Sequence, residues 1–235
     1  MGTVDIYLGH GAPSGLSHHR YARLRLQINT YLLDFPHAFA FQQLFCTIAI
    51  GAQTLVLSMK IRPARVSDVD GIARVHVESW RSTYRDIISA DYLASLSIDY
   101  HAERWLEILR KKNSKNCAFV AEDKSEQIIG FASGGQQRDA TIEYEAELYA
   151  IYLLESAQRL RLGSDLAQAV AGHFVTDGFK NMLVWVLENN PSRQFYEFIG
   201  GQYITKKAIT IGDQELIEVA YGWRNLQTLL ETNGY

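Results

Sequence analysis

The segment of the chain best suited to chemistry runs from Glu147 to Gly163, where an apolar strand pattern passes through a short turn into a helical pattern. A helix that begins directly after a strand leaves its first backbone N–H groups without partners, and its dipole adds positive potential at the same point. Such a helix start can bind a pyrophosphate. The segment holds a single glycine and is common among α/β proteins, so it predicts an anion site and no particular ligand.

The elements around this segment predict a mixed α/β domain with no internal repeat. Helices are expected to begin at the capping residues Ser67 and Ser89, at Asp99, over 158–176, and at Asn190 with Pro191 in its first turn. Strands are expected at 59–64, 117–122, 127–134, 147–154, 181–187, 203–211 and 214–223. The order is therefore strand, three helices, three strands, helix, strand, helix and two strands.

The first 58 residues differ from the rest of the chain. Residues 38–58 carry no charge, and 44–57 are strongly apolar, although three glutamines interrupt this region. A membrane anchor and a packed accessory helix are both possible interpretations. We favour a non-native or poorly ordered extension at 1–58, with Met59 as the natural first residue, because a complete domain pattern begins there.

Composition narrows the class of protein. The 235 residues carry a formal net charge of −3, which gives no reason to expect a nucleic-acid partner. The two cysteines, Cys46 and Cys117, are isolated, and no histidine lies in a metal-binding spacing, so no metal site is expected. Two isolated cysteines suit a reducing compartment, and we expect a cytoplasmic protein for which a membrane is an unlikely partner.

Several motifs together resemble the GNAT superfamily of N-acetyltransferases. Gln158, Arg161 and Gly163 align with its motif A, Q/R-x-x-G-x-G/A, which wraps the pyrophosphate of coenzyme A. The segment 183–201, LVWVLENNPSRQFYEFIGG, closely resembles motif B and is the most specific part of the match. Residues 74–84 resemble the first helix of a bacterial subgroup, and 129–134 its third strand. The resemblance covers 59 to about 225.

The resemblance implies a GNAT fold of the mixed α/β class. Its central, twisted, mostly antiparallel sheet has about six to seven strands, is splayed between strands 4 and 5, and is flanked by helices. The GNAT domain would span 59–225, followed by a tail at 226–235. The implied activity moves the acetyl group of the cosubstrate acetyl-CoA to an amine acceptor in a ternary complex, without a metal. GNAT relatives often form dimers, so a homodimer is a further expectation.

The resemblance also assigns roles to single residues. Tyr196 would protonate the departing thiolate, since a phenol keeps its proton at neutral pH, and Glu147 would be the base that accepts the ammonium proton. Trp80 and Tyr84 would line the acceptor pocket. The coenzyme would contact the strand edge and the following loop through Ile151, Tyr152, Leu153, Gln158, Arg159, Leu160, Arg161, Leu162, Gly163, Ser164 and Asn190.

Two departures from the family pattern bear on the coenzyme. Arg161 stands where the family has the first glycine of the loop, and its guanidinium could either crowd the phosphates or contact them. Glu155 replaces a proline and brings a like charge towards phosphate. An alternative function is therefore a catalytically weakened acetyl-CoA-binding or regulatory module of the same fold.

Structural interpretations of the same side chains remain open. Tyr196 has the spacing of a helix core aromatic, and the stripe of Trp80 and Tyr84 is typical of a packed face. Glu147 could be a solvated carboxylate, with Glu143 or Glu145 as the base in its place. His76 lies on an apolar helix face and is expected to be a buried histidine with a hydrogen-bond partner.

Overall fold

The computed structural model describes residues 5–6, 24–25, 59–111, 115–139 and 141–231. The chain divides into two compact units, Met1–Gln53 and Thr54–Tyr235. In the first unit, β1 (Asp5–Ile6) pairs antiparallel with β2 (Leu24–Arg25). The apolar stretch 38–58 lies outside the described residues, so its nature remains a prediction. No helix within the described ranges is both long enough and apolar enough to cross a membrane.

The second unit is built on a seven-stranded sheet with the order β3-β4-β5-β6-β7-β9-β8. All neighbours in it are antiparallel except β6 and β7, which run parallel. The predicted mixed α/β fold with a mostly antiparallel sheet of six to seven strands is therefore confirmed, and the structure adds that β6 and β7, its fourth and fifth strands, run parallel. The strands are β3 (Lys60–Pro63), β4 (Cys117–Glu122), β5 (Ile128–Gln136), β6 (Ala146–Leu153), β7 (Met182–Leu187), β8 (Gln202–Ile211) and β9 (Gln214–Trp223).

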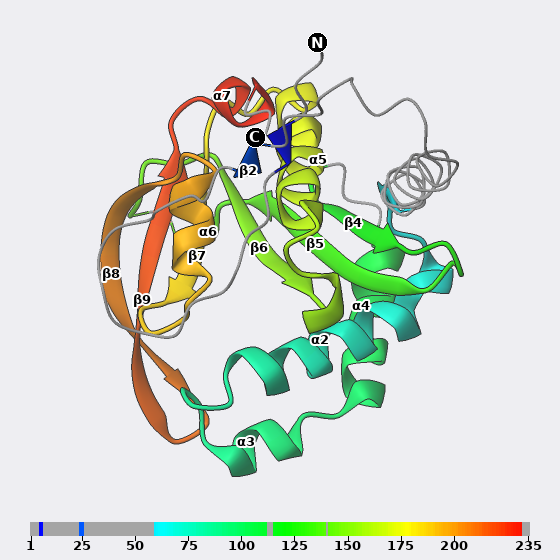
Figure 1. The fold of residues 1–235 in the computed structure, drawn as a ribbon. Coiled ribbons are helices and arrows are strands. Elements are labelled where there is room, and N and C mark those ends of the chain that lie inside the picture. The colour runs from blue at the N-terminus through cyan, green and yellow to red at the C-terminus, as the bar shows by residue number, and fades with distance from the viewer. Residues whose placement is uncertain (1–4, 7–23, 26–58, 112–114, 140, 232–235) are drawn as a thin grey trace, which may run out of the picture. The chain divides into compact units, whose positions relative to one another are not determined.

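Helices cover both faces of this sheet, as Figure 1 shows. Alternate strand residues point to opposite faces, so Val120 and Phe131 pack with α2 and α4, while Ala121 and Ala132 join the core beneath α5. The α6 helix packs on the same face as α5, because Tyr196 belongs to the α5 core. The helices are α2 (Val69–Thr83), α3 (Ala90–Ser95), α4 (Ile98–Arg110), α5 (Leu162–Thr176), α6 (Arg193–Phe198) and α7 (Leu226–Glu231), with short 3₁₀ turns η1 (Val66–Asp68) and η2 (Glu155–Ala157).

Two predicted helix starts on the α2 side of the sheet need correction. Ser67 lies inside η1 and does not cap α2. The Asp68 carboxylate instead accepts hydrogen bonds from the Arg65 backbone N–H and from the Arg62 guanidinium. The α4 helix begins at Ile98 with Ser97 as its cap, one residue before the predicted Asp99. The Ser89 cap of α3 is confirmed.

The two helices nearest the predicted site also begin later than the sequence indicated. The α5 helix starts at Leu162, because Arg159 and Arg161 adopt left-handed backbone conformations that interrupt any earlier turn. Asn190 forms a turn, accepting a hydrogen bond from Ser192 N at 2.8 Å, and α6 begins at Arg193. The α7 helix lies in the segment that the sequence suggested was a tail, and it packs against α5.

The sheet divides at β6. This strand pairs with β7 through residues 146–148 only. On its other edge it pairs with β5, and Tyr149 is the extra residue of a bulge between Leu148 and Ala150. A bulge bends the strand that carries it. Beyond Leu148, β6 therefore leads away from β7, which stays paired with β9 along its length (Figure 1).

Candidate functional site

A cavity of about 620 Å³ occupies the fork between β6 and β7. Its floor is the free edge of β6, residues 149–153, and its opposite side is formed by residues 184–186 of β7. The start of α5 and one face of α6 close two further sides, and the end of α2 contributes Thr83 and Tyr84. Because β7 no longer pairs with β6 here, the backbone N–H and C=O groups along that edge of β6 can bind an extended ligand as an added strand would.

The start of α5 provides a site for an anion. Arg161 occupies its N-cap position, and among the described residues no side chain caps the helix start, so the first amides of α5 remain available. Arg159 and Arg161 have φ angles of 62° and 65° and both line the cavity. Gly163 and Ser164 line it as well. Two guanidinium groups and a helix N-terminus thus concentrate positive potential at one end of the cavity.

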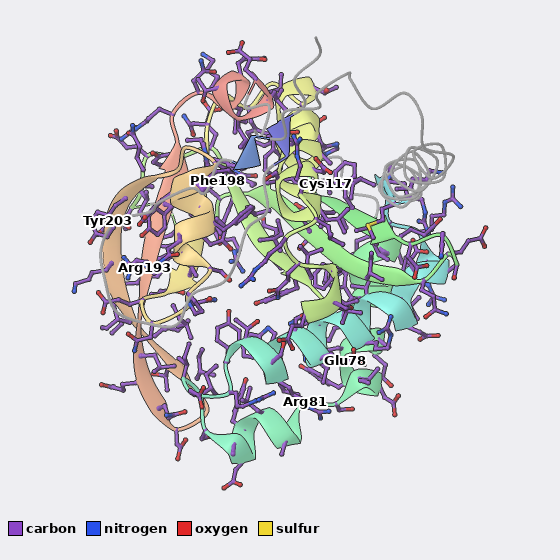
Figure 2. The ribbon with its side chains drawn as sticks, viewed as in Figure 1. Glu78, Arg81, Cys117, Arg193, Phe198 and Tyr203 are labelled. Carbon is purple, nitrogen blue, oxygen red and sulfur yellow. The ribbon has the colours of Figure 1, made fainter. Side chains whose placement is uncertain are left out.

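Close packing holds α5 and α6 around this end. A Cβ added at Gly163 would lie 3.2 Å from the Phe195 ring, so glycine permits the two helices to approach. Phe198 lies at the far end of α6 from Arg193 (Figure 2). It lines the same cavity yet is 66 % exposed, which places it at the cavity mouth. One wall of the cavity is therefore the face of α6 that carries Gln194, Phe195 and Phe198.

Four tyrosines line the cavity, and one of them, Tyr149, donates its hydroxyl hydrogen bond to the Gln136 backbone oxygen. The other three lie near one another at one end: Tyr84 follows α2, Tyr152 is on β6 and Tyr196 is on α6. Burial raises the pKa of all three, most plainly for Tyr152 and Tyr196. Asn190, which is 5 % exposed, donates a hydrogen bond from Nδ2 to Tyr84 Oη at 3.3 Å. Phenols with raised pKa values stay protonated at neutral pH, so this end of the cavity holds proton donors and no negative charge.

Glu147 lies on β6 just before the fork and is 2 % exposed. Its carboxylate accepts hydrogen bonds from the backbone N–H and Nε of Arg138 at 3.2 and 3.1 Å, and from Arg138 Nη2. Hydrogen bonding to this carboxylate raises the pKa of Arg138. Glu147 does not line the cavity, so a proton would have to reach it by way of the strand edge or a water molecule.

The cavity brings together most of the side chains proposed from the sequence. Lining it are Tyr84, Ile151, Tyr152, Leu153, Gln158, Arg159, Arg161, Gly163, Ser164, Asn190 and Tyr196. Leu162 is instead buried in the α5 core, and Leu160 is 41 % exposed outside the cavity lining. Trp80 lies behind Tyr84, with its ring edge-on at 5.0 Å between centroids, and does not line the cavity.

Sequence reasoning missed several residues of the lining. Trp185 on β7 and Gln194, Phe195 and Phe198 on α6 contribute to it. The strand pattern marked Trp185 only as part of an apolar run, although the resemblance implied that the sheet is splayed beside this strand. Helical spacing predicts that Gln194, Phe195 and Phe198 share a face of α6, because Phe198 lies four and three residues after the other two, but it does not indicate that this face lines a cavity.

His76 departs from its predicted environment. Its ring stacks on Tyr152 at 5.3 Å and lies 4.2 Å from His101 between ring centroids. The expected hydrogen-bond partner is missing, since the buried Nδ1 has none among the described residues. Burial lowers the pKa of His76 to about 3, and the neighbouring His101 adds to this effect. The side chain is therefore neutral at physiological pH.

Comparison with known sequences gives two kinds of match. The sequence model of the FR47-like proteins matches residues 138–209, which include β6, the fork and α5. An uncharacterised N-acetyltransferase, YuaI of Bacillus subtilis, is 40 % identical over 169 residues, covering 72 % of this chain and 95 % of YuaI. A spermidine N(1)-acetyltransferase of Thermoplasma acidophilum is 29 % identical over 112 residues, covering 47 % of this chain and 66 % of that enzyme.

Solved structures share the fold. The PaiA N-acetyltransferase of Thermoplasma acidophilum, in complex with coenzyme A, superposes with a TM-score of 0.56 at 24 % identity, covering 68 % of this chain and 98 % of that one. YncA of Salmonella typhimurium, solved with its cofactor acetyl-CoA, gives a TM-score of 0.54 at 18 % identity, covering 76 % and 97 %. At these identities the likeness establishes the arrangement of elements and not the role of any side chain.

Proposed function

Because the chain belongs to the GNAT superfamily of N-acetyltransferases and is therefore an acyltransferase, we propose that it transfers the acetyl group of acetyl-CoA to a primary amine. The acceptor is the amine of a small molecule or a protein, and it attacks the thioester directly in a ternary complex. The observation that carries the proposal is a single cavity. It joins the unpaired edge of β6 to the uncapped start of α5 and its two arginines.

In our proposal each part of the coenzyme is assigned to a different part of the cavity. Residues 151–153 offer strand-edge hydrogen bonds to the two amides of the pantetheine arm. The amides from Leu162 to Ser164, with Arg159 beside them, face the pyrophosphate. The left-handed backbone at Arg161 has the conformation that glycine adopts readily, so the arginine keeps the loop path that the motif requires. This backbone conformation supports our proposal that Arg161 is compatible with coenzyme binding.

Transfer needs a base and an acid. The acceptor arrives as an ammonium ion and must lose a proton before its nitrogen can attack the thioester carbonyl. In our proposal Glu147 accepts this proton through water, and a phenol of the cavity protonates the departing thiolate. Binding both reactants in one cavity lowers the barrier to direct attack of the amine on the thioester. The reaction therefore needs no covalent intermediate on either cysteine.

The decisive experiment combines coenzyme titration with an acetyl-transfer screen. We expect acetyl-CoA to bind with a Kd below about 100 µM, or roughly 5.5 kcal/mol. We also expect thiol release when polyamines, aminoglycosides, amino acids or peptide N-termini are added. Polyamines are the first acceptors to test because one relative is a spermidine acetyltransferase.

A substitution at Glu147 tests proton transfer separately from coenzyme binding. Glu147→Gln keeps the shape of the side chain but cannot take up the ammonium proton, and we expect turnover to fall by about 100-fold with coenzyme affinity unchanged. Coenzyme binding without thiol release for any acceptor would favour the alternative, a regulatory module that retains the fold. Absence of coenzyme binding would reject the proposed transferase.

A further inference from the structure

The ammonium group of Lys207 occupies a site that three other side chains form. Its Nζ lies 3.9 Å from the centroid of the Trp185 ring, 3.4 Å from Asp139 Oδ2 and 3.5 Å from Glu218 Oε1. An aromatic face attracts a cation through its π electrons, and carboxylates attract it by their charge. We refer to Trp185, Asp139 and Glu218 as the ammonium site, because together they bind a primary ammonium.

The register of three strands builds the ammonium site. Lys207 on β8 lies directly opposite Glu218 on β9, and Trp185 on β7 lies opposite Ala220, two residues further along β9. Side chains at paired positions, and at every second position of one strand, share a face of the sheet. Lys207 and Trp185 therefore point to the same face, and Lys207 reaches across β9 to the indole. The three strands can be followed side by side in Figure 1.

The ammonium site adjoins the cavity at the fork. Trp185 lines this cavity while its ring carries the ammonium of Lys207. On the other side of the fork, Tyr149 also lines the cavity, and the Arg138 guanidinium lies 4.4 Å from its ring centroid and pairs with Glu147. One aromatic ring on each side of the fork therefore already holds a cation that belongs to the protein.

These internal cations bear on the charge of the acceptor. The carboxylates of Glu147, Asp139 and Glu218 are each paired with a side chain of the protein. An acceptor whose second ammonium entered the ammonium site would have to displace Lys207. Because Lys207 is tethered to the sheet, its effective concentration at the site is on the order of millimolar, so a dissolved amine competes poorly with it.

We propose that Lys207 is a specificity-determining residue: by filling the ammonium site, it restricts the acceptor to amines that carry a single positive charge. This inference rests on the proposed acetyl transfer and names the acceptor class of the same cavity. A polyamine carries a second ammonium close to its reacting nitrogen, and Lys207 repels that charge from Trp185. A monoamine with a neutral or anionic remainder meets no such repulsion.

The first test compares two acceptors of equal length, pentylamine and 1,4-diaminobutane, in which a methyl group replaces the distal ammonium. We expect the parent to use pentylamine with the higher kcat/KM. Lys207→Met keeps the apolar stem and removes the charge, so Trp185 and Glu218 become free to bind the distal ammonium of the diamine. The ratio of the two kcat/KM values should then shift towards the diamine by about tenfold, which one cation–π contact and one ion pair can supply.

Lys206→Met is the matched control for this substitution. Lys206 is the preceding residue of β8 and lies on the opposite face, opposite Val219, which belongs to the α5 core. Its Nζ pairs with Glu188 at 3.3 Å. The acceptor ratio of Lys206→Met should equal that of the parent. A parent that prefers the diamine, or an unchanged ratio in Lys207→Met, would overturn the inference.

Calorimetric titration with 1,4-diaminobutane tests the ammonium site without turnover. We expect Lys207→Met and Lys207→Gln to bind the diamine about tenfold more tightly than the parent does, and a second change, Glu218→Gln, to remove this gain. Equal affinity in the parent and in both Lys207 variants would reject the inference even if acetyl transfer is observed. Parent protein that releases no thiol with any amine would instead reject the proposed function, while tighter diamine binding by the variants would still support the ammonium site.

Discussion

Asn190 Nδ2 donates a hydrogen bond to Tyr84 Oη across 3.3 Å and thereby joins the end of α2 to the turn that opens α6. The two residues are 106 positions apart in the chain, and both are almost fully buried. The same asparagine accepts from Ser192 N, so one side chain holds a local turn and a long-range contact. Two walls of the cavity are fixed relative to each other at this point.

Removing the Asn190 side chain should destabilise the protein. We expect Asn190→Ala to lower the free energy of unfolding by about 1–3 kcal/mol, because it leaves a buried hydroxyl and a backbone N–H without their partner. Asn225→Ala is the matched control: Asn225 Oδ1 also accepts from a backbone N–H two residues on, but the residue is exposed. Urea unfolding of both variants measures the difference, and an equal loss would show that the Tyr84 contact adds nothing.

The left-handed backbone at Arg161 can be tested with two substitutions. Arg161→Gly should keep or improve coenzyme A binding, because the loop already follows a path open to glycine. Arg161→Ala should be less stable than Arg161→Gly by roughly 1 kcal/mol, since only the alanine retains a Cβ at positive φ. Calorimetric titration and thermal unfolding give the two readouts. A tenfold loss of affinity in Arg161→Gly would assign the phosphate contact to the guanidinium.

His76 makes stability depend on pH. Its pKa is lowered by burial from 6.5 to about 3 in the folded protein, so the unfolded chain binds a proton that the folded chain does not. The stability that depends on neutral His76 is fully present above pH 6.5, and it is lost as the pH falls from 6.5 towards 3. We expect this residue to account for a loss of about 2 kcal/mol between pH 7 and pH 5.

The control for this effect is His76→Phe, which preserves an aromatic ring against Tyr152 and His101. The free energies of unfolding of parent and variant are measured in urea at the two pH values. Subtracting one protein from the other cancels the contribution of groups that both share. The variant should gain about 2 kcal/mol relative to the parent on going from pH 7 to pH 5. A constant difference between the two proteins would show that the pKa of His76 is the same in the folded and unfolded states.

Cys117 should be unreactive in the folded protein. Burial raises the pKa of its thiol to about 12, so little thiolate exists at pH 8. In a Cys46→Ser background, we expect its reaction with an aromatic disulfide reagent to be at least about a hundredfold slower than that of free cysteine. Unfolding in urea should restore the ordinary rate. Fast reaction in native buffer would contradict the burial of this thiol and would also add background to thiol-release assays.

The sequence alone predicted the kind and order of nearly every element between Met59 and Trp223. It could do so because apolar periodicity, caps and turn residues act over a few positions, and each predicted strand and helix there has a counterpart in the structure. It also indicated the anion site, since a strand followed at once by a helix start is a local signal. The helix boundaries at Ser67, Gln158 and Asn190 were wrong because side chains from elsewhere or unusual φ angles decided them.

Tertiary structure decided how the cavity forms and which of the expected side chains line it, whereas the resemblance had indicated only that the sheet is splayed between its fourth and fifth strands. The fork between β6 and β7 arises from a parallel pairing that stops after 148 and from a bulge at Tyr149, and neither leaves a mark in the residue pattern. The pairing of Tyr84 with Asn190 likewise depends on a sheet that brings α2 and α6 to the same opening. Local preferences act over one or two turns of chain, whereas the surroundings of a phenol depend on every element that packs around it.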